Sequence, residues 1–392
     1  MILRKKSKRI RALAVLAGVL SGAIAMATDV HLRIVTCNVK EGIADTANAR
    51  DACGNMLTTN DLDGAGPNSG LNPDILCLEE TRSLSNLQSF RDDFLPGYHV
   101  TRGTFVDAGN NCQACIYRSD LTLLDTAELV TNGPRRLLRV VLDVPGTDEH
   151  LVVYTHHFKA GVEASDIATR AAEANRSANH VSANFANGIN LDATGAQYFP
   201  SAYVFVGDLN HDDFAGATIN PMLDGGDNGL PTHLNDVRSE TLAGASVSPF
   251  IGDTWSTQGS LDRRYDYILV SDLIFDPLDT NNNGTVSQAE RNAAGFVYIS
   301  GDDLGRRANG DVDATTQGTD HAPVILDITL PCRKGDLNVD GIIDLPDLSG
   351  FLAVFGLSDG DPGFEPCADL DDSGTIDLGD LSGFLGKFGT TG

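Results

Sequence analysis

Residues 203–213 are Tyr-Val-Phe-Val-Gly-Asp-Leu-Asn-His-Asp-Asp, which predicts a buried strand followed by a polar turn. The first four residues are aromatic or β-branched and a glycine bounds them, as is typical of a strand inside a sheet. Such a strand excludes charge from its middle but delivers polar groups where it leaves the sheet. Asp208 and Asn210 alternate, so on an extended backbone both side chains point to the same side. A carboxylate and an amide placed together can hold a water molecule and an anionic oxygen.

Five further apolar runs predict strands, and each carries polar residues at one of its ends. The runs cover residues 31–39, 73–82, 150–157, 265–270 and 319–327. The Ala-rich stretch 165–186 favours a helix. Strands that alternate with helices indicate an α/β domain. Because ligands bind at the ends of such strands, the recurrence of polar ends predicts one shared site.

Six of these polar segments follow one another in a recognisable order. They are Asn38, Glu-Glu80-Thr-Arg82, His157-Phe-Lys159-Ala-Gly, Gly-Asp208-Leu-Asn210, Arg264-Tyr-Asp266-Tyr-Ile-Leu and Asp320-His321-Ala-Pro-Val. Their order resembles the endonuclease/exonuclease/phosphatase superfamily, which includes deoxyribonuclease I and the abasic-site endonucleases. The resemblance extends over roughly residues 30–330. It implies an α/β fold, a four-layer sandwich of two β-sheets flanked by helices, and a metal-dependent phosphodiesterase.

Hydrolysis of a phosphodiester requires neutralised phosphoryl oxygens, an in-line water and a proton for the leaving oxygen. Hard oxygen ligands suit Mg²⁺, with Mn²⁺ as the alternative, and the chain has no cysteine cluster that suggests zinc. We expect Glu80 to be the main ligand of this ion, assisted by Asn38 and Asp320. The resemblance implies the same three residues.

The remaining polar residues are expected to handle protons and phosphate. Asp266 would fix the tautomer of His321 and raise its basicity. Asp208 would orient or deprotonate the attacking water, and Asn210 would hold a phosphoryl oxygen. The resemblance implies a charged or proton-transferring role for the Asp266–His321 pair at the scissile phosphate.

His157 matches the second histidine of the family and is a candidate general acid. Neighbouring strand residues face opposite ways, so only one of His156 and His157 should enter the site, and we choose His157. Arg82 and Lys159 are the expected phosphate contacts. Members of the family commonly have Gln where this chain has Glu79, which we expect to add negative charge near the metal. A related subgroup often has Asn at the position of His156.

Residues 1–27 predict a secretory signal peptide, with cleavage after Ala27 or, alternatively, after Ala25. The segment has a basic head and a short apolar stretch, and no other stretch predicts a transmembrane segment. Its removal takes away six basic residues and no acidic one, so the formal net charge changes from −26 to −32. Such acidity argues against tight metal-free binding of a polyanion. It is compatible with a phosphate substrate whose charge is met by metal ions.

The chain has seven cysteines, an odd number for a secreted protein. Cys37 and Cys77 lie in apolar runs and predict small core residues. We expect a disulfide somewhere among Cys53, Cys112 and Cys115, and a bridge between Cys332 and Cys367.

Residues 331–392 contain an internal repeat whose two copies lie 33 residues apart. Each copy has oxygen-bearing residues at positions 1, 3, 5, 9 and 12 and Gly at position 6, the EF-hand calcium spacing, followed by Leu-Ser-Gly-Phe-Leu. The expected Ca²⁺ ligands are Asp336, Asn338, Asp340, Asp344 and Asp347 in loop 336–347, and Asp369, Asp371, Ser373, Asp377 and Asp380 in loop 369–380.

This repeat resembles the type I dockerin domain, with Asp at position 12 in place of Glu. Dockerins bind cohesin modules, so the resemblance implies tethering to a scaffold or surface protein. We expect Ca²⁺ to be required for folding, because 12 acidic and 3 basic residues lie within these 62 residues. The predicted organisation is a leader at 1–27, a catalytic domain at 28–330 and a small helical calcium-loop domain at 331–392.

A third stretch, 279–290, has the same calcium spacing with Glu at position 12. Its expected ligands are Asp279, Asn281, Asn283, Thr285 and Glu290. We expect one structural calcium loop inserted in the catalytic domain.

These patterns favour a secreted, metal-dependent phosphodiesterase, most simply a nuclease. A sphingomyelinase-like lipid phosphodiesterase is the alternative within the same fold, although the one tryptophan, Trp255, is followed by polar residues. Inositol-phosphate phosphatases fit less well, because His-Asp-Asp follows Asn210. A non-catalytic calcium-dependent adhesion or scaffold protein is the alternative from another class. The complete set of polar strand ends argues against it.

Overall fold

The computed structural model describes residues 29–39, 47–58, 70–191, 197–210, 219–236, 265–281, 283–297, 321 and 323–390. The expected leader, Arg264, Trp255 and Asp320 lie outside these residues. The chain divides into a larger unit, residues 31–144 and 149–330, and a smaller unit that comprises residues 331–392, 145–148 and those before 31. Among the helices within the described ranges, none is both long and apolar enough to cross a lipid bilayer.

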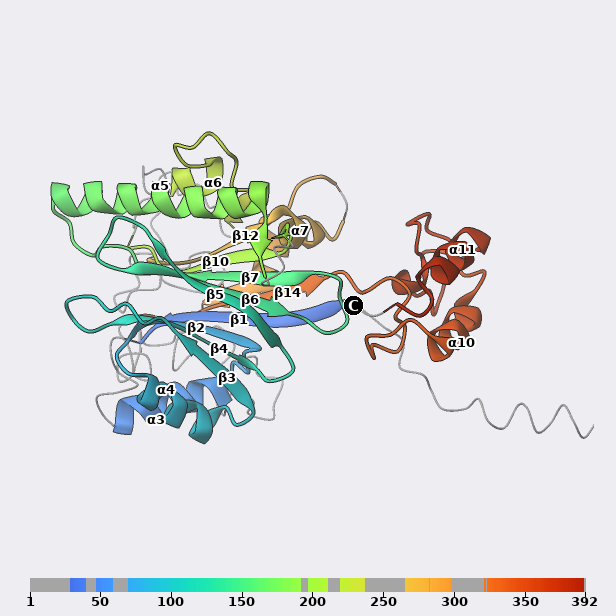
Figure 1. The fold of residues 1–392 in the computed structure, drawn as a ribbon, viewed down its shortest axis with the longest axis horizontal. Coiled ribbons are helices and arrows are strands. Elements are labelled where there is room, and N and C mark those ends of the chain that lie inside the picture. Colours follow the sequence, from blue (N-terminus) through green and yellow to red (C-terminus); the bar gives the residue numbers. More distant parts are fainter. Residues whose placement is uncertain are drawn as a thin grey trace, which may run out of the picture. The chain divides into compact units, whose positions relative to one another are not determined.

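Two six-stranded mixed sheets form the larger unit (Figure 1). The order in the first sheet is β13 (Gly295–Val297), β14 (Val324–Leu330), β1 (Val30–Asn38), β2 (Ile75–Thr81), β4 (Cys112–Arg118) and β3 (Tyr98–Arg102). The order in the second sheet is β11 (Leu234–Asp236), β12 (Asp266–Ser271), β10 (Tyr203–Asp208), β7 (His150–Thr155), β6 (Arg136–Asp143) and β5 (Thr122–Val130). A short hairpin of β8 (Ile189–Asn190) and β9 (Gln197–Tyr198) stands apart from both sheets.

Helices cover the outer faces of the sheets and complete four layers (Figure 1). The first sheet packs against α3 (Ala47–Thr58) and α4 (Leu84–Phe94), and the second against α5 (Ala164–Asn187) and α6 (Asn220–Asp224). Three short helices follow β12: α7 (Asp272–Phe275), η1 (Asp276–Leu278) and α8 (Gln288–Ala294). The predicted α/β sandwich of two sheets flanked by helices is confirmed. The helix expected at 165–186 is α5, with one more residue at each end.

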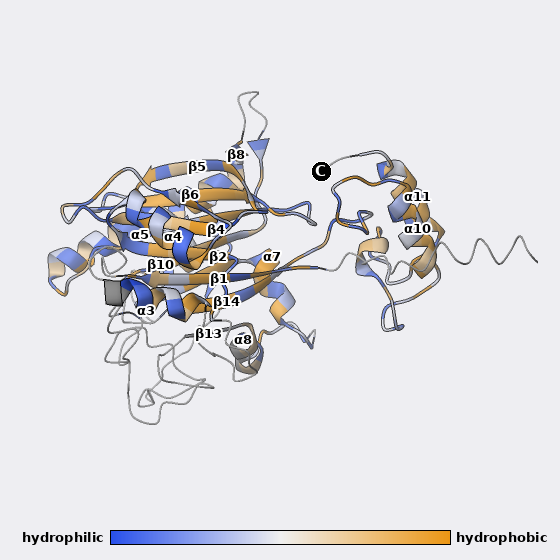
Figure 2. Ribbon diagram, turned by 90° about the horizontal axis from the view of Figure 1, so that it is seen from below, coloured by the Kyte–Doolittle hydropathy of each residue, from blue (hydrophilic) through white to orange (hydrophobic). Residues whose placement is uncertain are grey.

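The sheets hold together because their strands are apolar on both faces. One core lies between the first sheet and its helices, with Leu78 and Phe90 among its members, and another between the second sheet and α5, with Tyr154 and Phe205. Figure 2 shows β2 and β10 predominantly in the apolar colour. Strands that are buried on both sides leave polar side chains only at their ends.

Strand direction and register gather these ends at one edge. β1 and β2 are parallel, with Asn38 opposite Glu79, and β7 and β10 are also parallel. β12 is antiparallel to β10, so Asp266 at its start lies opposite Asp208 at the end of β10. The acid at the beginning of one strand therefore joins the acids at the ends of the others.

Within residues 331–390, the smaller unit has two helices, α10 (Leu345–Val354) and α11 (Leu378–Lys387), and a short turn of helix η2 (Pro366–Ala368). Phe351 and Phe384 stack at the centre of its core, with ring centroids 5.4 Å apart. The predicted bridge between Cys332 and Cys367 is confirmed.

The expected disulfide among Cys53, Cys112 and Cys115 is wrong, because these three cysteines are free and buried. Cys115 lies opposite Cys77 on the neighbouring strand, inside the sheet, while Cys53 lies on α3 with its side chain in the core between that helix and the first sheet. The close Cys-x-x-Cys spacing falls on one strand, where successive side chains point to opposite faces.

Candidate active site

The polar ends of β1, β2, β10 and β12 gather at one edge of the larger unit, which we call the polar edge. Asp208 lies at its centre and is almost fully buried. It is the last residue of β10. The preceding residue, Gly207, has φ 132°, and a Cβ there would lie 2.0 Å from the carbonyl oxygen of His156. Only glycine therefore lets β10 approach β7 this closely at the point where the carboxylate emerges.

Asn38, at the end of β1, connects the two sheets. Its side-chain Nδ2 donates to Asp208 Oδ2 at 3.0 Å and to Glu80 Oε1 at 3.2 Å. One amide thus holds together carboxylates from β10 and β2. Residues 38, 80 and 208 are far apart in the chain, but the structure brings them to one point.

Glu79 and Glu80 take different environments because β2 is irregular here. The strand has a bulge between Leu78 and Thr81, and Glu80 adopts a left-handed conformation with φ 57°. Such a conformation is strained for a residue other than glycine and is retained where the surroundings enforce it. The irregularity leaves Glu79 fully buried and presents the partly exposed Glu80 carboxylate to Asn38.

Glu79 lies in an environment that disfavours its charged form. Burial, with the nearby Asp266 carboxylate, raises the pKa of Glu79 well above its usual value, which opposes the negative charge that we expected this residue to add. Its Oε1 accepts a hydrogen bond from the Thr36 hydroxyl at 3.1 Å.

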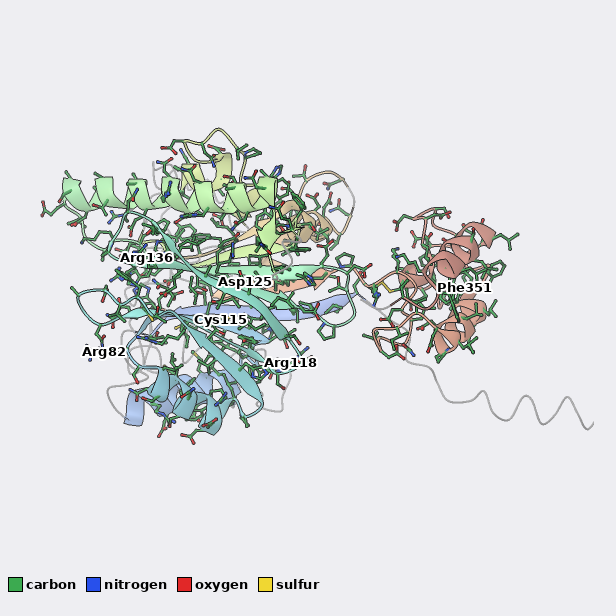
Figure 3. All side chains as sticks on the ribbon, in the orientation of Figure 1. Arg82, Cys115, Arg118, Asp125, Arg136 and Phe351 are labelled. Atoms are coloured by element: carbon green, nitrogen blue, oxygen red, sulfur yellow. A yellow bond between two sulfur atoms is a disulfide. The ribbon has the colours of Figure 1, made fainter. Side chains whose placement is uncertain are left out.

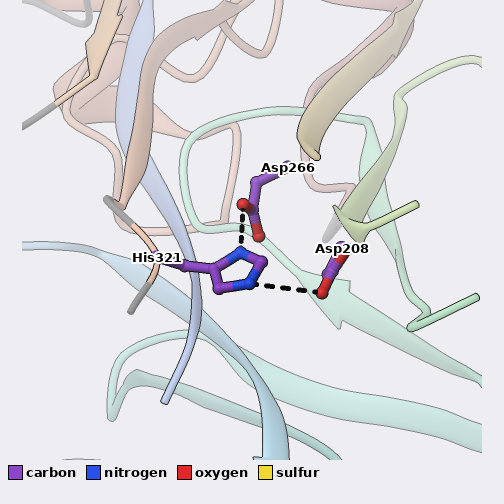
Figure 4. Close-up of side chains that lie close together, drawn as sticks. All are labelled: Asp208, Asp266 and His321. Atoms are coloured by element: carbon purple, nitrogen blue, oxygen red, sulfur yellow. Dashed lines mark hydrogen bonds and ion pairs between the residues drawn. The ribbon is translucent and has the colours of Figure 1, made fainter. Parts of the chain in front are cut away.

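His321 bridges two aspartates (Figure 4). Its Nδ1 lies 2.7 Å from Asp266 Oδ2, and its Nε2 lies 3.7 Å from Asp208 Oδ2. The three side chains offer ligand atoms that all lie within 4.8 Å of one another. Burial raises the pKa of Asp208, an effect that His321 opposes and Asp266 reinforces.

The side chains of His156 and His157 point to opposite sides of the chain, as alternation along a strand predicts. His157 Nε2 lies 3.4 Å from Asp208 Oδ2, and its Nδ1 lies 3.7 Å from Glu80 Oε1. His156 instead packs edge-on against Phe158 on the side of α5. Burial lowers the pKa of His156 to about 3 and that of His157 well below its usual value, so both rings are neutral.

Asn210 reaches the site in a different way from the one expected. β10 ends at Asp208, and Asn210 has φ 49°, so the two residues do not alternate along an extended backbone. The Asn210 backbone N–H donates to Asp208 Oδ1 at 2.8 Å, and its side-chain Nδ2 donates to the Phe158 carbonyl at 3.2 Å. The turn fixes the Asp208 carboxylate, which is a positioning contact that the alternation argument missed.

Three basic residues lie near the polar edge, and the sequence motifs did not single out one of them, Arg135. Arg135 donates from Nη1 to the Phe158 carbonyl at 3.1 Å and pairs with Asp107 at 2.9 Å. Lys159, an expected phosphate contact, pairs with Asp166 at 2.8 Å. Arg82, the other expected contact, is half-buried at the end of β2. Arg135 lies in a turn between two strands and has no strand-end signal, so only the fold could reveal it.

The donor atoms suit a hard divalent cation. Asn38 and Glu80 offer an amide and a carboxylate at the same edge, and oxygen donors of this kind favour Mg²⁺ or Mn²⁺. Asp320, the third expected ligand, lies outside the described residues. The group of Asp208, Asp266 and His321 could also hold a metal.

The three loops with calcium spacing share one bonding pattern. The aspartate at position 1 accepts from the backbone N–H groups of positions 5 and 6 in each loop: Asp336, Asp369 and Asp279. The acid at position 12 accepts from the N–H groups of positions 3 and 9: Asp347, Asp380 and Glu290. Asp344 and Asp377, expected as ligands at position 9, are the N-cap residues of α10 and α11.

Solved structures that are similar to this chain are distant from it in sequence. The structure is similar to truncated TDP2 from Caenorhabditis elegans, at 12% identity over 76% of this chain and 97% of that chain, with a TM-score of 0.47. It is also similar to the human Nocturnin catalytic domain with bound sulfate, at 15% identity over 77% and 96%, with a TM-score of 0.47. A third is an endonuclease/exonuclease/phosphatase from Beutenbergia cavernae, at 18% identity over 79% and 76%, with a TM-score of 0.46.

Among curated proteins, none matches the chain. The model of the Endonuclease/Exonuclease/phosphatase family matches residues 35–321, from β1 to the histidine of the Asp266–His321 pair. The match covers well over half of the sequence and all the described residues of the polar edge. The chain therefore belongs to the endonuclease/exonuclease/phosphatase family and is a metal-dependent phosphodiester hydrolase.

Proposed function

We propose that this enzyme is an extracellular nuclease that its C-terminal unit tethers through a calcium-dependent contact. The observation that carries the catalytic part is the Asn38 amide, which joins Glu80 and Asp208 beside the Asp266–His321 pair. Ligand oxygens and a proton-accepting pair thus lie at a single edge. A phosphodiester placed there meets every group that its hydrolysis requires.

Each residue has an assigned part in this proposal. Asn38, Glu80 and Asp320 hold the divalent ion, which neutralises charge on the phosphoryl oxygens when bound. Asp208 orients and deprotonates the attacking water. Asp266 accepts from His321 Nδ1, which leaves His321 Nε2 directed toward Asp208.

The two remaining polar groups face the phosphate. His157 is neutral before substrate binds and offers an N–H donor, and the negative charge of a phosphate raises its pKa toward that of a general acid. Asn210 holds a phosphoryl oxygen through its amide. Arg82 and Lys159 contact the flanking phosphates.

A lipid phosphodiesterase is the second candidate, and one observation favours it. The turn that follows Lys159 exposes Val162, at 78%, and the start of α5 exposes Ile167, at 48%. Two exposed aliphatic side chains beside the site could contact the surface of a membrane.

A substrate panel separates these activities. The purified protein is incubated with plasmid DNA, RNA, sphingomyelin vesicles and an inositol phosphate, each with Mg²⁺ and with a chelator. The proposal predicts Mg²⁺-dependent cleavage of DNA or RNA that His321→Ala and Glu80→Ala abolish while the thermal midpoint stays unchanged. Cleavage of sphingomyelin alone, or nucleic-acid cleavage that survives both substitutions, would contradict it.

The tethering part has separate support in the repeated loops of the smaller unit. Asp336, Asp340 and Asp347 place carboxylate oxygens within 4.8 Å of one another, as do Asp369, Asp371 and Asp380. We assign Ca²⁺ to both groups and to the inserted loop of Asp279 and Glu290, and a cohesin-type module as partner of the smaller unit. The proposal predicts that EGTA melts residues 331–392 and releases the partner. Calcium-independent folding of the isolated segment would contradict it.

A further inference from the structure

The loop between β3 and β4, residues 103–111, carries an exposed aromatic ring that the catalytic assignment leaves unused. Phe105 is 41% exposed. The guanidinium of Arg136, at the start of β6, lies over the ring at 4.7 Å from its centroid. The guanidinium therefore lies against one face of this exposed ring, in a cation–π arrangement.

Two sets of hydrogen bonds and ion pairs place this loop beside the polar edge. Arg102, just before the loop, donates from Nη2 to the Arg82 carbonyl at 2.8 Å, next to Glu80. Asp107, within the loop, pairs with Arg135, and Arg135 donates to the Phe158 carbonyl that also accepts from Asn210. Figure 3 labels Arg82 and Arg136 at the same end of the sandwich, where β1 and β2 end.

The loop is held in place rather than free. The Phe105 backbone N–H donates to Glu128 Oε1 at 2.9 Å. A second hydrogen bond joins the Thr104 hydroxyl to the other oxygen of the same Glu128 carboxylate. The loop therefore presents Phe105 in a defined position before any ligand binds.

The charges around the ring favour an anionic ligand. Four arginines and two carboxylates lie on this loop or contact it and its flanking residues, so guanidinium groups outnumber carboxylates at the loop itself, in a chain whose formal net charge is −26. The arginines are Arg82, Arg102, Arg135 and Arg136, and the carboxylates are Asp107 and Glu128. A positive surface with one exposed ring suits a ligand that has both phosphates and flat bases.

We propose that Phe105 and Arg136 form a stacking surface for a nucleobase of the substrate, next to the scissile phosphate, while the neighbouring arginines contact the adjoining phosphates. This inference rests on the proposed nuclease activity and specifies its substrate as a strand with an accessible base. Stacking of this kind tolerates any base, because every base has a π face.

Two matched substrates test the role of the base. One is a short single-stranded DNA oligonucleotide, and the other has the same length and phosphates but abasic sites throughout. Phe105→Ala is expected to raise KM for the intact oligonucleotide by about 5- to 150-fold and to leave KM for the abasic one unchanged. Phe105→Trp should restore the wild-type KM, and Arg136→Gln should raise KM for the intact oligonucleotide more than for the abasic one, because it removes part of the stacking surface.

Phe199→Ala is the matched control, because Phe199 is 56% exposed and follows Tyr198, which bonds His150 at the opposite end of β7 from His157. It should change neither KM. An equal change of KM for both substrates in Phe105→Ala, or no change for either, would overturn the inference. Mg²⁺-dependent cleavage of the abasic strand by every variant would still support the nuclease, so the two proposals fail separately.

Discussion

The polar edge of the larger unit and the loops of the smaller unit both gather carboxylates, but they do so by opposite means. In the loop that begins at Asp336, the carboxylates bond to backbone N–H groups within ten positions of themselves. At the polar edge, Asn38 bonds Asp208, and Asp266 bonds His321. Local spacing fixes the first arrangement, whereas the topology of two sheets fixes the second.

The two regions also differ in how they treat charge. Although burial raises it, backbone N–H donors hold the pKa of Asp380 below its usual value, so this carboxylate stays charged. At the polar edge, burial dominates and raises the pKa of Glu79 and Asp208. Backbone N–H donors therefore stabilise the charge of this one loop carboxylate, whereas burial raises the pKa of Asp336 in the other loop and opposes the charged forms of Glu79 and Asp208 at the polar edge. Such poised groups are typical of active sites.

Asp208→Asn should cause the largest loss of activity among the substitutions at the polar edge. The substitution keeps the shape and an acceptor for Asn38 but removes the group that deprotonates water, so kcat should fall by about 10²- to 10⁴-fold. The thermal midpoint should stay within a few degrees of wild type. The exposed Asp227→Asn is the control and should retain full activity. More than a tenth of the wild-type kcat in Asp208→Asn would contradict the assignment.

Removal of the Cys332–Cys367 disulfide should lower the stability of the smaller unit alone. Cys332→Ser combined with Cys367→Ser opens a link between residues 35 positions apart. Loop-closure entropy predicts a loss of about 4 kcal/mol from the stability of this unit. Calorimetry should show its transition at a lower temperature and the transition of the larger unit unchanged. A shift of both transitions by the same amount would show that the two units unfold together.

Glu173 is a buried carboxyl outside the polar edge, so a substitution there tests the effect of burial on stability without changing the catalytic residues. Burial raises the pKa of Glu173 to about 7, while its Oε2 accepts from the Lys159 backbone N–H at 2.7 Å. Because the folded-state pKa is raised, the full stability is present below the unfolded pKa of about 4.5 and is lost as the pH rises through about 7. Two and a half pH units correspond to about 3 kcal/mol.

Glu173→Gln should therefore flatten the dependence of unfolding free energy on pH between about 4.5 and 7. Urea denaturation at a series of pH values measures it. The exposed Glu163→Gln should keep the wild-type slope. An unchanged slope in Glu173→Gln would mean that another group titrates.

The smallest effect is expected at Lys159, whose side chain pairs with Asp166 at the surface. Lys159→Met should change the free energy of unfolding by less than about 1 kcal/mol and raise KM by about five-fold at most. Steady-state kinetics at two salt concentrations would test it. A rise in KM that persists at high salt would indicate a closer phosphate contact than the surface pair suggests.

Much of the fold was predictable because it follows from local pattern. The apolar runs gave β1, β2, β7 and β10, and the Ala-rich stretch gave α5. Alternation along the strand separated His156 from His157. The Cys332–Cys367 bridge was predictable because the two cysteines flank similar segments near the C-terminus.

What the sequence did not reveal depends on how the two sheets meet. The left-handed conformations of Glu80 and Asn210 occur at the ends of β2 and β10, and they depend on the packing around those ends. The raised pKa of Glu79 depends on burial beside Asp266, which is distant in the chain. Arg135 reaches the edge through the Phe158 carbonyl, a contact that no motif describes.

The central claim is that Asn38 and Glu80 supply ligands to the ion on which phosphodiester cleavage depends. Its most direct test is cleavage measured against Mg²⁺ concentration for wild type and Glu80→Gln. Wild type should lose activity in a chelator and regain it with Mg²⁺, and Glu80→Gln should need about 10- to 100-fold more metal at an unchanged thermal midpoint. Identical metal dependence in the two proteins, or cleavage that persists in the chelator, would contradict the claim.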